Sequence, residues 1–268
     1  MFDNILIATD DSPLITHAIK YTAELFPESA YHLISVVDTT DRSVPQNLTM
    51  REEMRKAAEE AIEDAEKILG KRGIEVLKKK RPEGVPYKEI EKFSQKEDID
   101  MVVMASHSTV GAQRFHIGDT TLCYLKVSER PSLIFSRRPE IEIPNSIFNP
   151  TTFSTYSVEA TMIAIDLADH FDASLTTYHF DDDDPGHASR RVKKRAEKLG
   201  IDYTLEINKK ASDKDIIGRM NQHDFMIGSR GRKGILYRLH YIFPKFSLSS
   251  LEREIIAETE IPFLLTGD

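Results

Sequence analysis

A glycine-rich segment in the second half of the chain has the composition of an anion-binding loop. It reads GSRGRKG over residues 228–234, three glycines in seven residues with two arginines and a lysine between them. An apolar run from Phe225 to Ile227 precedes it, and a helix-like stretch beginning at Ile235 follows it. Glycines let backbone N–H groups approach a phosphate, and a following helix N-terminus adds partial positive charge. The segment therefore predicts a phosphate cradle, with a simple glycine turn among solvated charges as the alternative.

The elements that would position this loop occur twice along the chain. Each half begins with a short apolar strand, starting at Asn4 and at Ser146, that runs into a polar turn and an amphipathic helix. A second strand, a helix that ends at Gly70 or Gly200, a third strand, another helix and a buried strand follow. A loop, a helix and a last strand beside a proline complete each half. In the first half, Thr49 and Glu52 form a capping box at the start of the long helix.

The alternation of strands and helices predicts parallel βαβ units with right-handed crossovers. We therefore expect an α/β fold of two doubly wound, Rossmann-like domains. Each should be a five-stranded, mostly parallel sheet with helices on both faces. The domains should cover residues 1–138 and 145–268, with a proline-bounded linker at 137–146.

Ligands of such sheets bind at the carboxyl ends of the strands, near the point where the strand order reverses. In the first half, the turn at Asp10 and the loop 105–120 should meet there. In the second half, the turn at Thr152 and the loop 228–250 should meet in the same way.

These residues resemble the motifs of the universal stress proteins, in a tandem two-domain form, over nearly the whole chain. In nucleotide-binding members of that family, an aspartate ends the first strand and holds the adenosine. A loop of the form G-x2-G-x9-G-S/T holds the phosphates and ribose. The sequence DDSP at 10–13 resembles the first motif, and PTTFS at 150–154 resembles a variant of it with Thr152 in place of the aspartate. The segment GSRGRKG resembles the start of the loop.

Neither half keeps the complete pattern. In the first half, Ala105 and Ser108 stand where two loop glycines are expected, Gly118 is retained, and Asp119 replaces the Ser/Thr, with Thr120 just after it. Asp119 would add negative charge at a helix start, which disfavours phosphate but suits a helix N-cap. In the second half, the closing pair is retained only if an insertion lies within HYIFPKFS.

The resemblance implies one adenine-nucleotide site, for ATP with Mg²⁺, ADP or AMP, and the second half is the favoured place. The expected residues there are Gly228, Ser229, Arg230, Gly231, Gly234, Ser249 and Ser250 at the phosphates, with Thr152 near the ribose. The counterparts in the first half are Asp10, Gly118 and Thr120. Aromatic residues of the insertion, 237–250, would cover the site, fill a dimer interface, dock on a partner or pack on their own domain.

Composition excludes several classes of protein. The net charge of −8 argues against a general nucleic-acid binder. The basic runs KKKRPEG and RRVKKRAEK are not expected to bind nucleic acid, and the second, on a helix, is expected to be a solvated face. One cysteine, Cys123, cannot form a disulfide framework, which fits a reducing compartment. The N-terminal sequence does not resemble a signal peptide, and no apolar run approaches the roughly 18 residues of a membrane span. We therefore expect a cytoplasmic protein that makes no membrane contact.

No pattern for catalysis or for a metal site is recognisable. His107 and His116 lack further ligands, Cys123 has no nearby base, and DDDDPG at 181–186 lacks the ligand spacing of a calcium loop. The SGGxDS and HxGH motifs of related nucleotide-dependent enzymes do not occur. We expect a non-catalytic stress-response protein that binds one adenine nucleotide, and a nucleotide-independent adaptor is the alternative. The family pairs through its last strand, so a homodimer or pairing of the two halves is expected, with an unidentified protein partner.

Overall fold

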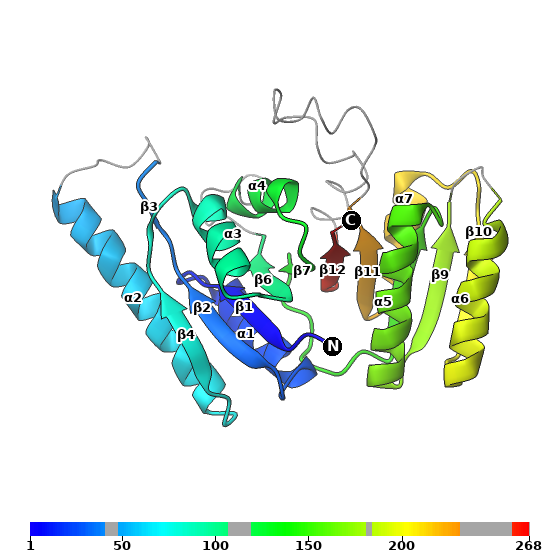
Figure 1. Cartoon of the computed structure of the whole chain (residues 1–268), viewed down its shortest axis with the longest axis horizontal. Helices are drawn as coiled ribbons and strands as arrows, with labels where there is room; N and C mark the ends of the chain where they lie inside the picture. Colours follow the sequence, from blue (N-terminus) through cyan, green and yellow to red (C-terminus); the bar gives the residue numbers. More distant parts are fainter. Residues whose placement is uncertain (41–47, 107–118, 181–183, 231–258, 268) are drawn as a thin grey trace. The chain divides into compact units, whose positions relative to one another are not determined.

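The computed structural model describes residues 1–40, 48–106, 119–180, 184–230 and 259–267. The chain divides into two compact units, Met1–Glu142 and Ile143–Asp268. Within the described residues, five strands of each unit pair with one another, all in parallel, and helices accompany them (Figure 1). The fold class predicted from the sequence is confirmed.

The first unit has the strand order β7-β6-β1-β2-β4. Its strands are β1 (Asn4–Ala8), β2 (Ala30–Ile34), β4 (Val76–Lys80), β6 (Met101–Ala105) and β7 (Ser132–Phe135). Its helices are α1 (Pro13–Leu25), α2 (Leu48–Gly70), α3 (Pro86–Lys96) and α4 (Asp119–Val127). A small second sheet pairs β3 (Val37–Asp38) with β5 (Glu83–Gly84). Since the chain continues from β1 to β2 on one side and β6 lies on the other, the order reverses between β1 and β6.

The second unit repeats this arrangement with the strand order β10-β9-β8-β11-β12. Its strands are β8 (Ser146–Thr151), β9 (Ser174–His179), β10 (Tyr203–Ile207), β11 (Phe225–Ser229) and β12 (Phe263–Thr266). Its helices in the described residues are α5 (Thr155–Phe171), α6 (Gly186–Leu199) and α7 (Asp213–Met220). The order reverses between β8 and β11, which correspond to β1 and β6.

The long helix α2 differs from its sequence-based description at both ends. It already includes Leu48, so Thr49 lies in its first turn and not at its N-cap. At the other end Gly70 is still helical, and the left-handed residue that closes the turn is Gly73, with φ of 74°. The prediction for Gly200 is confirmed, because this glycine ends α6 in the left-handed region with the same φ of 74°. The helical spacing of apolar residues predicts that Ala57 and Ala58 both lie on the buried face of α2, but Ala57 is exposed and burial begins at Ala58.

An aspartate holds the start of the first strand in each unit. In the first unit, Asp100 Oδ2 accepts hydrogen bonds from the backbone N–H groups of Asp3 and Asn4, both at 2.8 Å. In the second unit, Asp224 Oδ2 accepts them from Asn145 and Ser146, both at 3.0 Å. Each aspartate directly precedes the buried neighbouring strand, so one side chain aligns two strands that are far apart in the sequence. This shared contact supports the internal repeat independently of the strand order.

Three partly or fully buried histidines make the stability of the protein depend on pH. Burial lowers the pKa of His17, His32 and His223 below the ordinary value of 6.5. Below that value the unfolded chain takes up protons that the folded chain binds less readily, so acid favours unfolding. The free energy of unfolding should therefore be fully retained above about pH 6.5 and should fall between about pH 6.5 and 5.

Urea unfolding followed by circular dichroism at several pH values checks this expectation. The denaturation midpoint should fall over that window, and His32→Gln should reduce the fall. The carboxylates whose pKa is lowered, such as Glu206, ionise below their ordinary value of 4.5 and do not contribute to this window. A midpoint that stays constant or rises as the pH falls would contradict the expectation.

Candidate functional site

The predicted site residue Asp10 lies at the strand-order reversal of the first unit. It follows β1, and Ser106 follows the neighbouring strand β6, so both lie at the carboxyl edge of the sheet. Asp10 is exposed, and its Oδ1 accepts a hydrogen bond from the backbone N–H of Ser12 at 2.9 Å. Ser12 in turn caps α1 by accepting from the N–H of Ile15 at 3.2 Å. Among the described residues, the other oxygen of Asp10 makes no hydrogen bond, so it is available to a ligand.

The polar groups at the ends of β1 and β6, next to Asp10, have hydrogen-bond partners within the protein. The Thr9 N–H donates to the Ile34 carbonyl at 2.8 Å, and the Ser106 N–H donates to the Phe135 carbonyl at 2.8 Å. The Thr121 hydroxyl donates to the Ala105 carbonyl at 2.9 Å, which holds the first turn of α4 against the end of β6. At this edge of the sheet, a ligand could therefore contact the Asp10 carboxylate and the start of α4. The hydrogen bonds described above hold the backbone there in place.

Two further predicted residues of the first unit belong to the start of α4. Thr120 is half-buried in the first turn of that helix, directly before Thr121. The helix begins at Asp119, and Gly118 lies outside the described residues. The structure therefore brings Thr120 and Asp10 to the same edge of the sheet.

In the second unit, Thr152 occupies the place of Asp10 and makes a similar turn. Its hydroxyl donates to Ser154 Oγ at 3.1 Å and lies 3.3 Å from Ser157 Oγ. It also accepts from the backbone N–H of Ser154 at 3.4 Å, as Asp10 accepts from Ser12. Ser154 caps α5 by accepting from the Ser157 N–H. The single hydroxyl proton of Thr152 is therefore already engaged within the turn.

The residue after Thr152 closes the turn with an aromatic side chain. Phe153 has a φ of 54°, in the left-handed region, and is only 8% exposed. Its ring lies 5.5 Å from the buried ring of His179 at the end of β9. His179 Nδ1 lies 3.1 Å from the Thr151 carbonyl, which only accepts, so this nitrogen carries the proton. In the first unit the corresponding Asp11 is exposed. The sequence alone did not predict that Phe153 and His179 pack together in this turn. The feature of the sequence that could have indicated it is an aromatic residue, Phe153, within a polar turn.

The described part of the glycine-rich loop begins inside a strand. Gly228 and Ser229 are the last residues of β11, and Gly228 lies outside the left-handed region. A Cβ on Gly228 would lie 2.9 Å from Met226 Cε, so the glycine makes room for that side chain. Arg230 is 7% exposed, and its N–H and Nε donate to the Thr266 carbonyl at 3.1 and 3.3 Å. These contacts draw the arginine toward the end of β12.

Several predicted features lie outside the described residues. They are Gly231, Gly234, Ser249, Ser250, the insertion 237–250, His107, His116 and residues 181–183 of the acidic run. Among the residues that the structure does describe, no three His, Cys, Asp or Glu side chains are placed to hold one metal ion. No described helix is both long enough and apolar enough to span a membrane.

The end of β8 shows a further departure from a regular strand. Pro150 lies within β8 and has no backbone N–H, and the register with β11 is recorded only as far as the Phe148–Met226 pair. The side-chain amide of Asn149 donates to the Ile227 carbonyl of β11 at 2.8 Å. This amide provides a cross-strand hydrogen bond where the proline cannot, so the sheet stays joined beside the turn.

Comparison with known proteins agrees with this architecture. The model of the universal stress protein family matches residues 1–135. A curated universal stress protein of Methanocaldococcus jannaschii is 24% identical over 143 residues, which cover 51% of this chain and 84% of that protein. The crystal structure of a universal stress protein from Archaeoglobus fulgidus is similar with a TM-score of 0.77 and 21% identity, over 99% of this chain and 97% of that one. A putative universal stress protein from Pseudomonas aeruginosa gives a TM-score of 0.65 at 12% identity, over 99% and 93%. The chain belongs to the universal stress protein family.

Proposed function

We propose that this chain is a non-catalytic regulatory protein of the stress response, and that it binds one adenine nucleotide in its first unit. The exposed Asp10 carboxylate at the strand-order reversal is the observation that supports this most directly. The sequence favoured the second unit. Three contacts of the second unit argue for the first unit. The Thr152 hydroxyl and Arg230 Nε are engaged in hydrogen bonds within the protein, and the Phe153 ring packs on His179 in the turn where a nucleotide would bind.

The chemistry of this edge suits a nucleoside better than a bare phosphate. A carboxylate accepts strong hydrogen bonds from hydroxyl groups, so Asp10 is suited to the two ribose hydroxyls. The same negative charge repels phosphates, which would lie toward the start of α4 near Thr120. The helix dipole there is favourable to a phosphate, and the Asp119 carboxylate opposes it. Mg²⁺ would accompany ATP and lower the repulsion between its phosphates and the nearby carboxylates. Binding would then change the affinity of a protein partner by thermodynamic linkage.

Calorimetric titration of the nucleotide-free chain with ATP, ADP and AMP, with and without Mg²⁺, tests the proposal. We expect saturable binding of one nucleotide per chain. Asp10→Ala should weaken it by about tenfold or more, because it removes a charge-assisted contact. Asp11→Ala is the matched control, since it removes an exposed neighbouring carboxylate and should leave the affinity nearly unchanged. Circular dichroism should show that both variants remain folded.

A variant of the second unit tests which of the two units binds the nucleotide. Gly231→Asp places a negative charge in the glycine-rich loop, and binding should persist in this variant. Loss of binding in Gly231→Asp, with unchanged binding in Asp10→Ala, would move the site to the second unit and contradict the placement proposed above.

The second candidate function is a nucleotide-independent adaptor that acts through protein contacts. The side chains that fill the turn of the second unit favour it, because Phe153 and His179 are buried there and pack against each other. Absence of binding at millimolar nucleotide would support this candidate and contradict the sensor. Pairing through the last strands, as a homodimer or between the two halves, stays a prediction that sedimentation velocity can test.

A further inference from the structure

Helix α6 carries a concentration of positive charge on an acidic protein. Within its 14 residues it has six arginines and lysines and one glutamate, a net charge of +5. The whole chain has a net charge of −8, so the residues outside α6 carry −13. Its buried residues, Ser189, Val192 and Ala196, follow helical spacing and attach one stripe of the helix to the unit.

The cations on the outward face of α6 are separate from those that form ion pairs. Lys193 pairs with Glu197 at 3.9 Å, and Arg195 pairs with Asp166 of α5, both on the flanks of the helix. Arg190, Arg191, Lys194 and Lys198 lie opposite the buried stripe and are all exposed. Among the described residues, none of these four is within ion-pair distance of a carboxylate. The outward face is therefore a row of cations available to an anionic partner.

The shape of this row limits what can bind it. Successive turns bring Arg190, Lys194 and Lys198 about 6 Å apart along the helix axis, over a total of about 12 Å. Glutamates at alternate positions of an extended peptide lie about 6.6 Å apart on one face. An extended peptide with the pattern Glu-x-Glu-x-Glu therefore matches the row turn by turn.

Other polyanions fit this surface less well. Single-stranded nucleic acid usually stacks its bases on several aromatic side chains, and α6 contains no Phe, Tyr or Trp and one histidine, His187, in its first turn. An anionic membrane is wide and flat, so it would also approach Asp166 and Glu197 on the flanks. Val192 and Ala196 are buried away from it, which leaves Leu199, at the C-terminal end, as the exposed large apolar residue of α6. A narrow acidic peptide avoids both difficulties.

We propose that the outward face of α6 is a docking surface for an extended acidic peptide segment of a partner protein. Arg190, Arg191, Lys194 and Lys198 make the contacts, and the surface is distinct from the nucleotide site. Exposed charge pairs of this kind act mainly through long-range attraction, so the affinity depends strongly on salt.

Fluorescence anisotropy of a labelled peptide with the full chain tests the proposal. The probe alternates glutamate and serine over about twelve residues, and its control replaces each glutamate by glutamine. The expected result is saturable binding of the glutamate peptide at about 50 mM salt, weakened at least fivefold at about 300 mM, and no binding of the glutamine peptide. The triple variant Arg191→Glu, Lys194→Glu, Lys198→Glu should weaken binding at least tenfold.

A second triple variant controls for net charge. Lys20→Glu, Lys71→Glu and Lys80→Glu make the same charge change at exposed lysines of the first unit, so the affinity should change less than threefold. If the α6 glutamate variant fails to fold by circular dichroism, the corresponding glutamine variant replaces it.

Three results would overturn the proposal. The first is absence of peptide binding at low salt. The second is an equal loss in the two triple variants, which would show a general charge effect. The third is tighter binding of a single-stranded RNA or of phosphatidylserine vesicles, or salt-sensitive self-association abolished by the α6 variant, which would assign the face to that occupant.

Discussion

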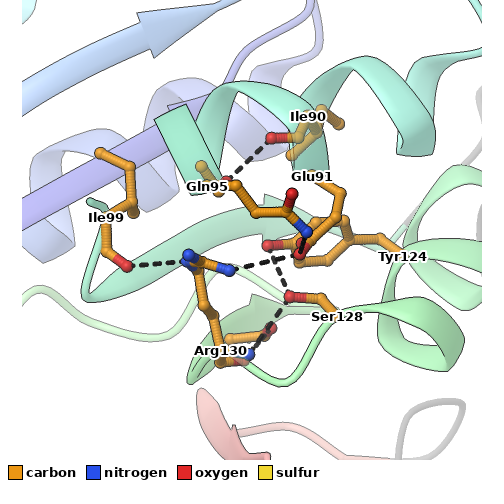
Figure 2. Close-up of polar contacts among 9 residues, drawn as sticks. Ile90, Glu91, Gln95, Ile99, Tyr124, Ser128 and Arg130 are labelled. Carbon is orange, nitrogen blue, oxygen red and sulfur yellow. Dashed lines mark hydrogen bonds and ion pairs between the residues drawn. The ribbon is translucent and has the colours of Figure 1, made fainter. Parts of the chain in front are cut away.

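Replacing Arg130 by methionine is expected to lower the free energy of unfolding of the first unit by about 2–4 kcal/mol. Arg130 Nε donates to the Ile99 carbonyl at 3.0 Å, and a terminal nitrogen donates to Glu91 Oε1 at 3.2 Å. The two side chains are only 23% and 15% exposed. Figure 2 shows how these contacts connect α3 with the turn between α4 and β7. The substitution would leave the Glu91 charge largely buried without this partner, which is the main source of the cost.

Three more residues belong to the hydrogen-bond network around Glu91 and Arg130. Gln95 also donates to Glu91 Oε1, at 2.9 Å, and the Ser128 hydroxyl joins the Arg130 N–H to the Tyr124 hydroxyl (Figure 2). Urea unfolding gives the free energy, and the double variant Glu91→Leu, Arg130→Met should recover part of the loss because it removes both charges. Arg138→Met, at an exposed arginine, is the control and should change stability by less than about 0.5 kcal/mol. A loss that small in Arg130→Met would show that the ion pair contributes nothing to stability.

Replacing Asp224 by alanine should lower the free energy of unfolding of the second unit by about 1–3 kcal/mol. Its Oδ2 accepts hydrogen bonds from the N–H groups of Asn145 and Ser146 and from the Ser146 hydroxyl at 2.9 Å. Bonds to a charged acceptor are stronger than neutral ones, but the site is exposed, which reduces the effect. Because Asp100 makes the equivalent contacts in the first unit, Asp100→Ala should cause a loss of similar size there.

Hydrogen exchange distinguishes this effect from a general loss of stability. In Asp224→Ala, the amides of Asn145 and Ser146 should exchange much faster, and those of Asp3 and Asn4 should not. The reverse pattern is expected in Asp100→Ala. Asp202→Ala is the matched control, because it removes another exposed carboxylate of the second unit, one that makes no side-chain hydrogen bond to the part of the chain that the structure describes. Equal exchange at both strand starts in either variant would contradict the assigned role.

The strand and helix pattern was predictable because it depends on local periodicity. Short apolar runs bounded by polar turns predicted the five main strands of each unit but not the short pair β3 and β5, and the helix spacing predicted the helices between them. The ends of α2 were less predictable. Glycine favours a helix end in general, but Gly70 and Gly73 both precede the next strand, and only the hydrogen bonds of the turn select Gly73 as the left-handed residue.

At the two turns on the carboxyl edges of the sheets, motif comparison predicted the equivalent positions but not the side-chain contacts. The sequence alone identified Asp10 and Thr152 as equivalent residues, and both accept a hydrogen bond from the N–H two residues ahead. It did not show that the Thr152 proton is engaged by neighbouring hydroxyls, that Phe153 turns its ring onto His179, or that Arg230 bonds to the end of β12. Those contacts join residues up to 36 positions apart, so no local pattern encodes them.

The sequence by itself determined the repeat, the α/β class, the family resemblance and the positions of the two turns, because each depends on residue type and short-range spacing. The tertiary structure decided that one oxygen of Asp10 makes no hydrogen bond to the described residues, and that the turn of the second unit is filled by its own side chains. It also decided which cations of α6 are paired and which face outward. These properties depend on the distances between side chains from different elements, and only packing of the sheet and its helices sets those distances.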